Sequence, residues 1–283
     1  MRYRLEYALF VFFGLVVRAL PLEVASAFAG GLWRLIAPLS KRHRRAMAHM
    51  EIAYPDATPD ERERLSSEMW ETMGRIFAES YRLAEISFSG RVVLDNPDEA
   101  RAIFKGEHGF VVCAAHQGNW EVGVAVLAEL GYKTAGIYQR LKNPFVDAAA
   151  RRLREPLYPG GLLPKGAAAA LAALRHVRNG GVISIMADLR ENKGVRVPFF
   201  GVPAPSTPFP AMLAVTLGKK LVLGEVIREK GVRFRVRIDE VEVVRTGDRE
   251  ADILATTANL QRKIEGYVRA RPGQWMWGHR RWG

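Results

Sequence analysis

From residue 110 onward, short apolar runs alternate with longer segments whose apolar positions recur every three to four residues. Short runs rich in Val, Ile and aromatic residues predict strands, and the longer segments predict helices. The predicted strands are residues 110–115, 134–138, 182–187, 221–229 and 232–244, with a hairpin turn at 230–231 between the last two. The predicted helices are residues 58–83, 120–130, 143–157, 165–181, 211–217 and 248–270. This alternation predicts an α/β fold, a single domain with a mixed central sheet flanked by helices.

Boundary residues sharpen two of these helices. Thr58 is a good N-cap, with Pro59 in the first helical position and acidic residues in the first turn. Gly180 is expected to end the helix at 165–181. The proline-rich segment at 194–210 is expected to be an ordered loop.

The first 40 residues are the most apolar part of the chain. The uninterrupted run at 7–17 is about half as long as the ~20 residues that a membrane-crossing helix needs, and Arg18 and Pro21 end it. A signal peptide fits poorly because apolar residues continue through Trp33 and Ile36. We predict that residues 1–40 form membrane-associating helices in the bilayer interface, and that residues 41–283 form the α/β domain. The alternative is a helix pair packed on the protein's own core.

Net charge points to an anionic partner. The chain has 42 Lys and Arg against 30 Asp and Glu, a net charge of +12. Such a surplus favours anionic lipid, an acidic carrier protein or nucleic acid, although a solvated basic surface would also explain it. No nucleic-acid-binding motif is present, so we expect no nucleic acid as a partner. The single cysteine, Cys113, excludes an internal disulfide.

The sequence AAHQGNWEVG at 114–123 places a histidine where a predicted strand becomes a helix. His116 lies at the carboxyl end of the strand, where open α/β sheets place their sites. Gly118 permits a sharp turn, Asn119 is a good N-cap, and Glu121 could curl back to orient the imidazole. His116 would then act as a general base, with the N–H groups of residues 118–120 facing an oxyanion. The alternative is that both side chains only cap the helix.

Other polar residues could complete such a site. Asp188 is a second acid at a strand end, and Arg140, Arg151, Arg152 and Arg154 could form a basic rim, although at least two of these arginines are expected to be solvated. No Gly-x-Ser-x-Gly nucleophile motif occurs, so the attacking hydroxyl would belong to the substrate. The six histidines have no metal-ligand spacing such as His-Glu-x-x-His, and we expect no metal.

Several dispersed motifs occur in one order along nearly the whole chain. They include HQGNWE (116–121), YQRLKNP (138–144), PFFG (198–201) and QWMWGHRRW (274–282). In these motifs the chain resembles the late acyltransferases of lipid A biosynthesis, the lauroyl/myristoyl acyltransferase family that includes the phosphatidylinositol mannoside acyltransferases. The family pattern commonly has Gln after the strand-end aspartate, whereas this chain has Leu189.

The resemblance implies transfer of a fatty acyl group from acyl carrier protein, or from coenzyme A in some branches, to a hydroxyl of a lipid A precursor or related glycolipid. It implies that His116 is the base and that Glu121 orients it. It also implies that residues 41–283 are the acyltransferase domain. The residues implied to bind substrate are Arg140, Asn143, Arg154 and Asp188, together with Gly118 and Asn119. The acyl thioester would be a co-substrate, and no cofactor is expected.

The resemblance also implies an enzyme at the cytoplasmic face of the bacterial inner membrane, with an anionic membrane surface as a partner. Residues 197–210 could wall an acyl groove or could be core, and residues 275–282 could be an interfacial segment or an arm on the core. The alternatives are an acyl-CoA-dependent mannoside or glycerolipid acyltransferase, a lipid hydrolase, and a non-catalytic peripheral lipid-binding protein. Acyl length, acceptor, donor and oligomeric state stay open.

Overall fold

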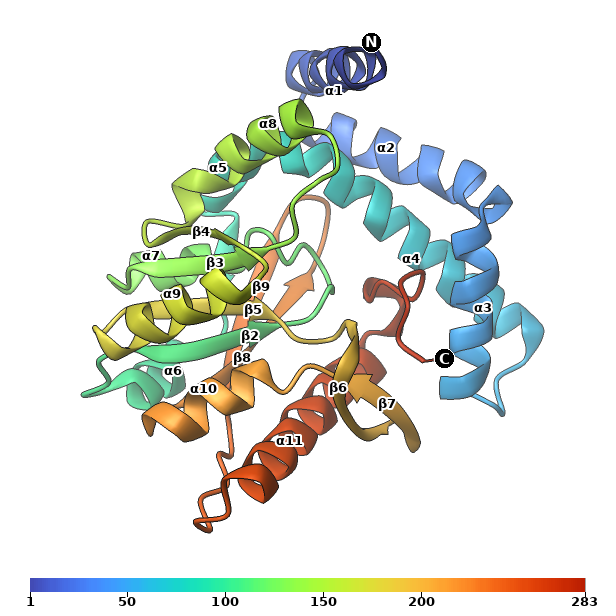
Figure 1. Cartoon of the computed structure of the whole chain (residues 1–283). Helices are drawn as coiled ribbons and strands as arrows, with labels where there is room; N and C mark the ends of the chain where they lie inside the picture. The colour runs from blue at the N-terminus through green and yellow to red at the C-terminus, as the bar shows by residue number, and fades with distance from the viewer. Residues whose placement is uncertain (283) are drawn as a thin grey trace.

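The computed structural model describes residues 1–282, and a seven-stranded sheet forms its centre (Figure 1). The strand order is β1-β9-β8-β2-β5-β3-β4. The strands are β1 (Val92–Leu94), β2 (Phe110–Ala114), β3 (Thr134–Tyr138), β4 (Gly161–Pro164), β5 (Val182–Met186), β8 (Leu221–Arg228) and β9 (Phe234–Val241). All neighbours pair in parallel except β8 and β9, which form the antiparallel hairpin. The predicted single α/β domain with a mixed sheet is confirmed.

Helices cover both faces of this sheet, so the apolar strands are buried on both sides. Along β2, Val111 and Cys113 enter one core and Phe110 and Val112 enter the other, as the two-residue period of a strand requires. The helices are α5 (Leu83–Ser87), α6 (Pro97–Phe104), α7 (Ala125–Glu129), α8 (Pro144–Arg154), α9 (Ala167–Arg178), α10 (Phe209–Leu217) and α11 (Arg249–Ala270), with single 3-10 turns η1 (Ala37–Leu39), η2 (Ser80–Arg82), η3 (Glu155–Leu157) and η4 (Pro272–Gln274).

Four further helices precede the sheet: α1 (Arg2–Ala19), α2 (Leu22–Ile36), α3 (Lys41–Ala53) and α4 (Pro59–Glu79). Thr58 caps α4 in a capping box with Glu61, which confirms the predicted helix start. Helix α2 packs closely along α4, since a Cβ on Gly74 would lie 2.3 Å from the carbonyl oxygen of Ala29. Helix α1 lies at one end of the molecule, above α8 (Figure 1).

The first two helices leave large apolar side chains exposed. Leu5, Phe12 and Leu15 of α1 are 57–64% exposed, and Phe28 and Leu35 of α2 are 67% and 76% exposed. Among the helices of residues 1–282, the stretch Leu22–Leu39 is long and apolar enough to cross a membrane by length and composition alone, and 33% of it is buried. The division of the chain at residue 40 stays a prediction.

The structure corrects two local predictions. The helix predicted at 120–130 is a series of turns followed by the single-turn helix α7, and in these turns Gly118 and Gly123 pack directly against Val226 of β8. The proline-rich segment at 194–210 is not a loop, since β6 (Arg190–Phe199) and β7 (Val202–Ser206) pair there as an antiparallel hairpin. Its turn contains Phe200 and Gly201, both with positive φ.

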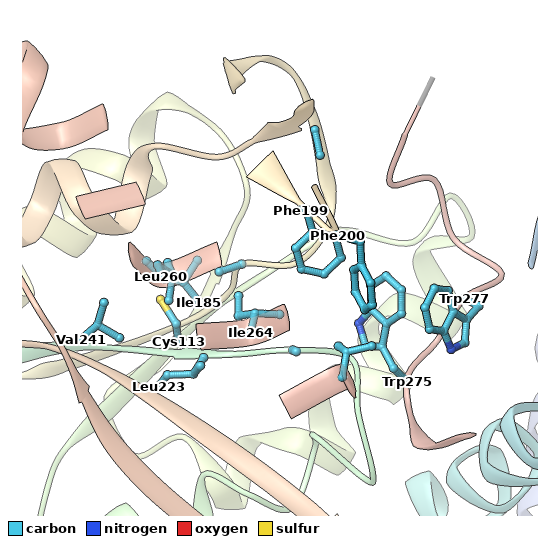
Figure 2. Packing of buried hydrophobic residues seen from close by; sticks show 14 of the residues in the cluster. Cys113, Ile185, Phe199, Phe200, Leu223, Val241, Leu260, Ile264, Trp275 and Trp277 are labelled. Carbon is cyan, nitrogen blue, oxygen red and sulfur yellow. The ribbon is translucent and has the colours of Figure 1, made fainter. Parts of the chain in front are cut away.

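The aromatic C-terminal arm packs on the core. Trp275 and Trp277 are fully buried, and their rings lie against those of Phe199 and Phe200 at the tip of the hairpin (Figure 2). Arg281 is also fully buried, donates to the carbonyl of Pro205, and stacks over the ring of Phe199. The sequence left two possibilities open for residues 197–210 and for residues 275–282. The structure shows that the C-terminal arm and these phenylalanines pack in the core.

Candidate active site

His116 and Asp188 meet at the carboxyl edge of the sheet. His116 follows β2, Asp188 follows β5, and these neighbouring parallel strands end side by side with Ala114 opposite Met186. One carboxylate oxygen of Asp188 lies 2.8 Å from His116 Nδ1. The other accepts from the backbone N–H of His116 and from Trp275 Nε1, each at 2.8 Å. The carboxylate therefore fixes both the ring and the backbone of the histidine.

The surroundings keep this carboxylate ionised. Asp188 is completely buried, which raises the pKa of a carboxyl group, but the His116 side chain and its hydrogen bonds outweigh burial and hold the pKa of Asp188 well below its usual range. Opposite an ionised carboxylate, Nδ1 carries the ring proton. Nε2 is then the basic nitrogen of His116, and it is the atom that can take a proton from a substrate hydroxyl.

Glu121 does not hold the imidazole in this structure, contrary to the prediction. Its two carboxylate oxygens accept from Arg154 at 2.8 and 2.5 Å, in a bidentate ion pair between the turn after β2 and the end of α8. The correction has a simple physical reason: the carboxylate nearest in sequence has an arginine partner, and the adjacent strand supplies the carboxylate for the histidine. Arg154 therefore lies next to the turn that follows His116, where it is paired with Glu121.

Gly118 and Asn119 have structural contacts that the prediction did not include. Gly118 has a φ of +60°, and its N–H donates to the carbonyl of Gln274, so this amide is not free for an oxyanion. Asn119 accepts from the N–H of Glu121 within a turn, but it caps no helix because α7 begins only at Ala125, and it donates to the buried carboxylate of Glu79 at 2.8 Å. Within residues 1–282 the amides of Asn119 and Trp120 have no hydrogen-bond acceptor, so of the three amides predicted to face an oxyanion these two stay candidates.

Two further predicted residues lie apart from the histidine. Asn143 caps α8 through its side-chain oxygen and donates to the carbonyl of Tyr3 and the carboxylate of Glu6, so it fastens α1 to the body. Arg140 is exposed on the loop before α8. The structure therefore brings together His116 and Asp188, with Glu121 and Arg154 on the adjoining turn. Asn143 instead holds α1 against α8, and Arg140 is exposed to solvent.

Sequence reasoning missed three aromatic neighbours of His116. Trp275 is the third donor to Asp188, and the ring of Trp120 lies 4.8 Å from that of His116. The ring of His279 lies 5.9 Å from that of His116, and neither of its buried nitrogens has a hydrogen-bond partner within residues 1–282. Burial lowers the pKa of His279 to about 4, which keeps this ring neutral. For Trp275 and His279 the only sequence signal was the aromatic and basic character of the C-terminal motif, whereas Trp120 belongs to the motif HQGNWE itself.

These features define a class of protein. A histidine oriented by a buried aspartate at the carboxyl edge of an α/β sheet is the arrangement of an enzyme that activates a hydroxyl group or water by general base catalysis. The chain belongs to the bacterial lipid A biosynthesis acyltransferase family, whose family model matches residues 1–283. The search of curated proteins found no match to the chain. The protein is accordingly an acyltransferase of lipid A biosynthesis.

Proposed function

We propose that the protein transfers a fatty acyl group from the thioester of acyl carrier protein to a hydroxyl of a lipid A precursor or related glycolipid. The observation that carries the proposal is the His116–Asp188 pair in a member of this family. A single displacement fits the site, because residues 1–282 contain no Gly-x-Ser-x-Gly nucleophile motif to hold an acyl intermediate.

In this mechanism His116 Nε2 removes the proton of the acceptor hydroxyl as its oxygen attacks the thioester carbonyl. The amides of Asn119 and Trp120 stabilise the negative charge that develops on the carbonyl oxygen. The carbon–sulfur bond then breaks, the carrier thiolate takes the proton from the His116 imidazolium, and the acyl ester is complete. Asp188 stabilises the imidazolium throughout.

The reaction would take place at the cytoplasmic face of the bacterial inner membrane. The exposed apolar residues of α1 and α2 support this placement, since large apolar side chains exposed along two successive helices favour contact with a bilayer. Three exposed cations, Lys41, Arg42 and Arg44, follow directly at the start of α3. Near an anionic leaflet each such charge contributes on the order of 1 kcal/mol. The same surplus of positive charge suits an acidic carrier protein.

Two alternatives follow from particular features. The family resemblance extends to acyl-CoA-dependent acyltransferases of mannosides and glycerolipids, which would use the same histidine with another donor and acceptor. The apolar N-terminal surface alone would also fit a peripheral lipid-binding protein without catalysis. Only the second alternative predicts that the imidazole of His116 is dispensable.

The test is acyl transfer by the purified full-length protein, with radiolabelled acyl carrier protein thioester and a lipid A precursor. Wild type is compared with His116→Ala and with His176→Ala, a control histidine on α9, by thin-layer chromatography of the lipid product. We expect product from wild type and the control and almost none from His116→Ala. Free fatty acid as the main product would indicate a hydrolase. Product with acyl coenzyme A alone would indicate the other donor, and equal product from all three proteins would refute the mechanism.

A further inference from the structure

A cavity of about 450 Å³ lies where the last turn of α1, the segment η2–α5 and the end of α8 meet. Three arginines line it: Arg18 of α1, Arg82 of η2 and Arg152 of α8. These residues are far apart in sequence, and the fold places them around one opening. The rest of the lining is mainly apolar, from Tyr81, Leu83, Ala84, Leu153 and Pro156, with Glu85 as its only acidic residue.

The charges of this cavity are not balanced. Glu85 is engaged by Arg82 at 2.6 and 2.8 Å, so these two residues neutralise each other. Arg18 donates only to the backbone carbonyl of Tyr81, and within residues 1–282 neither Arg18 nor Arg152 forms an ion pair. Arg151, the neighbour of Arg152 on α8, is by contrast paired with Glu155. Two guanidinium groups without an ionic partner thus border the cavity, beside its apolar residues Leu83, Leu153 and Pro156.

Guanidinium groups bind phosphate oxygens through paired N–H donors, so the lining suits a phosphate group attached to an apolar body. The position of the cavity near the apolar surface of α1 indicates that such a molecule is a membrane lipid. Arg18 lies in the last turn of α1, whose residues Leu15 and Val16 are 63% and 42% exposed. If α1 lies in the bilayer interface, the arginines lie at the depth of the lipid headgroups.

We propose that this cavity binds the phosphate of an anionic phospholipid headgroup. Arg18 and Arg152 bind the phosphate oxygens, and Leu83, Leu153 and Pro156 contact the glycerol and the first acyl carbons. The proposal rests on the membrane placement proposed above and does not depend on acyl transfer. It assigns the protein a lipid ligand that is neither donor nor acceptor and that fixes α1 against α8 at the membrane surface.

The test is calorimetric titration of the full-length protein with dihexanoyl phosphatidylglycerol, a soluble short-chain phospholipid, below its micelle concentration. The site variant is Arg18→Gln/Arg152→Gln. The control, Arg151→Gln/Arg178→Gln, loses the same charge outside the cavity. Arg82 is left intact because it also donates to the backbone of Leu20. Thermal unfolding of each variant establishes that the fold is retained.

We expect saturable 1:1 binding to wild type and to the control, and binding weaker by about tenfold or more in the site variant, because two charge-assisted contacts are lost. Dihexanoyl phosphatidylcholine, which has the phosphate but no net charge, should bind more weakly than phosphatidylglycerol. No saturable binding to wild type, or equal losses in both variants, would overturn the proposal. Inorganic phosphate that binds as tightly as the lipid would overturn the headgroup assignment and indicate a soluble phosphate.

The same titration is made with His116→Ala, which alters the active site and leaves the cavity unchanged. Headgroup binding should persist in this variant. A wild-type protein that binds the headgroup but transfers no acyl group would contradict only the proposed function. Acyl transfer by a wild-type protein that does not bind the short-chain lipid would contradict only this inference.

Discussion

Asp188→Asn is the substitution that tests how His116 is activated. In the wild type one oxygen of Asp188 faces two N–H donors, those of the His116 backbone and of Trp275, and the other faces His116 Nδ1. An asparagine has the same shape, and its carbonyl oxygen must face the two donors because neither can accept. Its NH2 group then points at Nδ1, which has to become an acceptor. The ring proton consequently moves to Nε2, the atom that should take the substrate proton.

The size of the effect follows from this exchange of tautomers. Loss of a correctly oriented base removes about 10³–10⁴ in rate, equivalent to about 4–5.5 kcal/mol of transition-state stabilisation. Glu121→Gln, in contrast, weakens the ion pair with Arg154 and leaves the histidine tautomer intact. We expect that variant to lose no more than about 10²-fold, through a small displacement of the turn.

The assay is single-turnover transfer from acyl carrier protein thioester to the lipid acceptor, with thermal unfolding as the check on folding. Asp188→Asn should have a much lower rate at every pH between 6 and 9, about 10³-fold or more below wild type. A folded Asp188→Asn protein within about tenfold of the wild-type rate would refute the reasoning. So would a larger loss in Glu121→Gln, which would restore Glu121 as the orienting carboxylate.

Three further substitutions test the surroundings of the site. Gly118→Ala should lower the free energy of unfolding by about 2–5 kcal/mol in urea titrations, since φ is +60° and the new Cβ would lie 2.1 Å from the carbonyl oxygen of Val226. Glu79→Gln should cost about 3–5 kcal/mol in the same assay, because it leaves the buried Arg228 without its carboxylate. His279→Gln should make the free energy of unfolding less dependent on pH between pH 6.5 and about 4. In the wild type the unfolded chain binds the His279 proton first, so up to about 3 kcal/mol is lost as the pH falls through that window.

Each of these predictions has its own control. Gly131 also has a positive φ, +84°, but open space around the new Cβ, so Gly131→Ala should cost only about 1–2 kcal/mol; equal losses at both glycines would contradict the steric argument. Asp98→Asn removes an exposed partner of Arg101 and should cost at most about 1 kcal/mol, against the larger loss at the buried pair. For His279, parallel profiles of wild type and variant from pH 4 to 6.5 would show that this ring does not titrate as described.

The strands were the most predictable part of the fold. Five of the seven central strands carry buried, mainly apolar residues at successive or alternate positions, and their positions in the structure agree with the predicted ranges to within a few residues. The two missed strands, β1 and β4, are short edge strands with partly exposed residues, so they lack such a run. The hairpin at 190–206 was missed because its prolines indicated a loop. Its two strands pair only with each other, where proline is tolerated.

The sequence also placed both His116 and Asp188 at strand ends, but it could not predict that they touch. They are 72 residues apart, and their contact depends on β5 lying beside β2 in parallel register, which no local pattern encodes. Proximity along the chain instead favoured Glu121 as the partner. Likewise, nothing in the segment 274–282 indicated that Trp275 would reach the same carboxylate, because the arm is positioned by its packing against Phe199 and Phe200.

A buried carboxylate connects the N-terminal helices to the site. Glu79, at the end of α4, accepts from Ser26 of α2, from both terminal nitrogens of Arg228 on β8, and from Asn119 in the turn after β2. Each of these bonds is 2.7–2.8 Å long and buried, so displacing α2 from the sheet would leave a charge unpaired in the core. Helix α2 and the turn that follows His116 are therefore held as one rigid unit. If α2 lies on the bilayer as proposed, its depth in the membrane sets the height of the histidine above the lipid surface, and no hinge is needed between the anchor and the site.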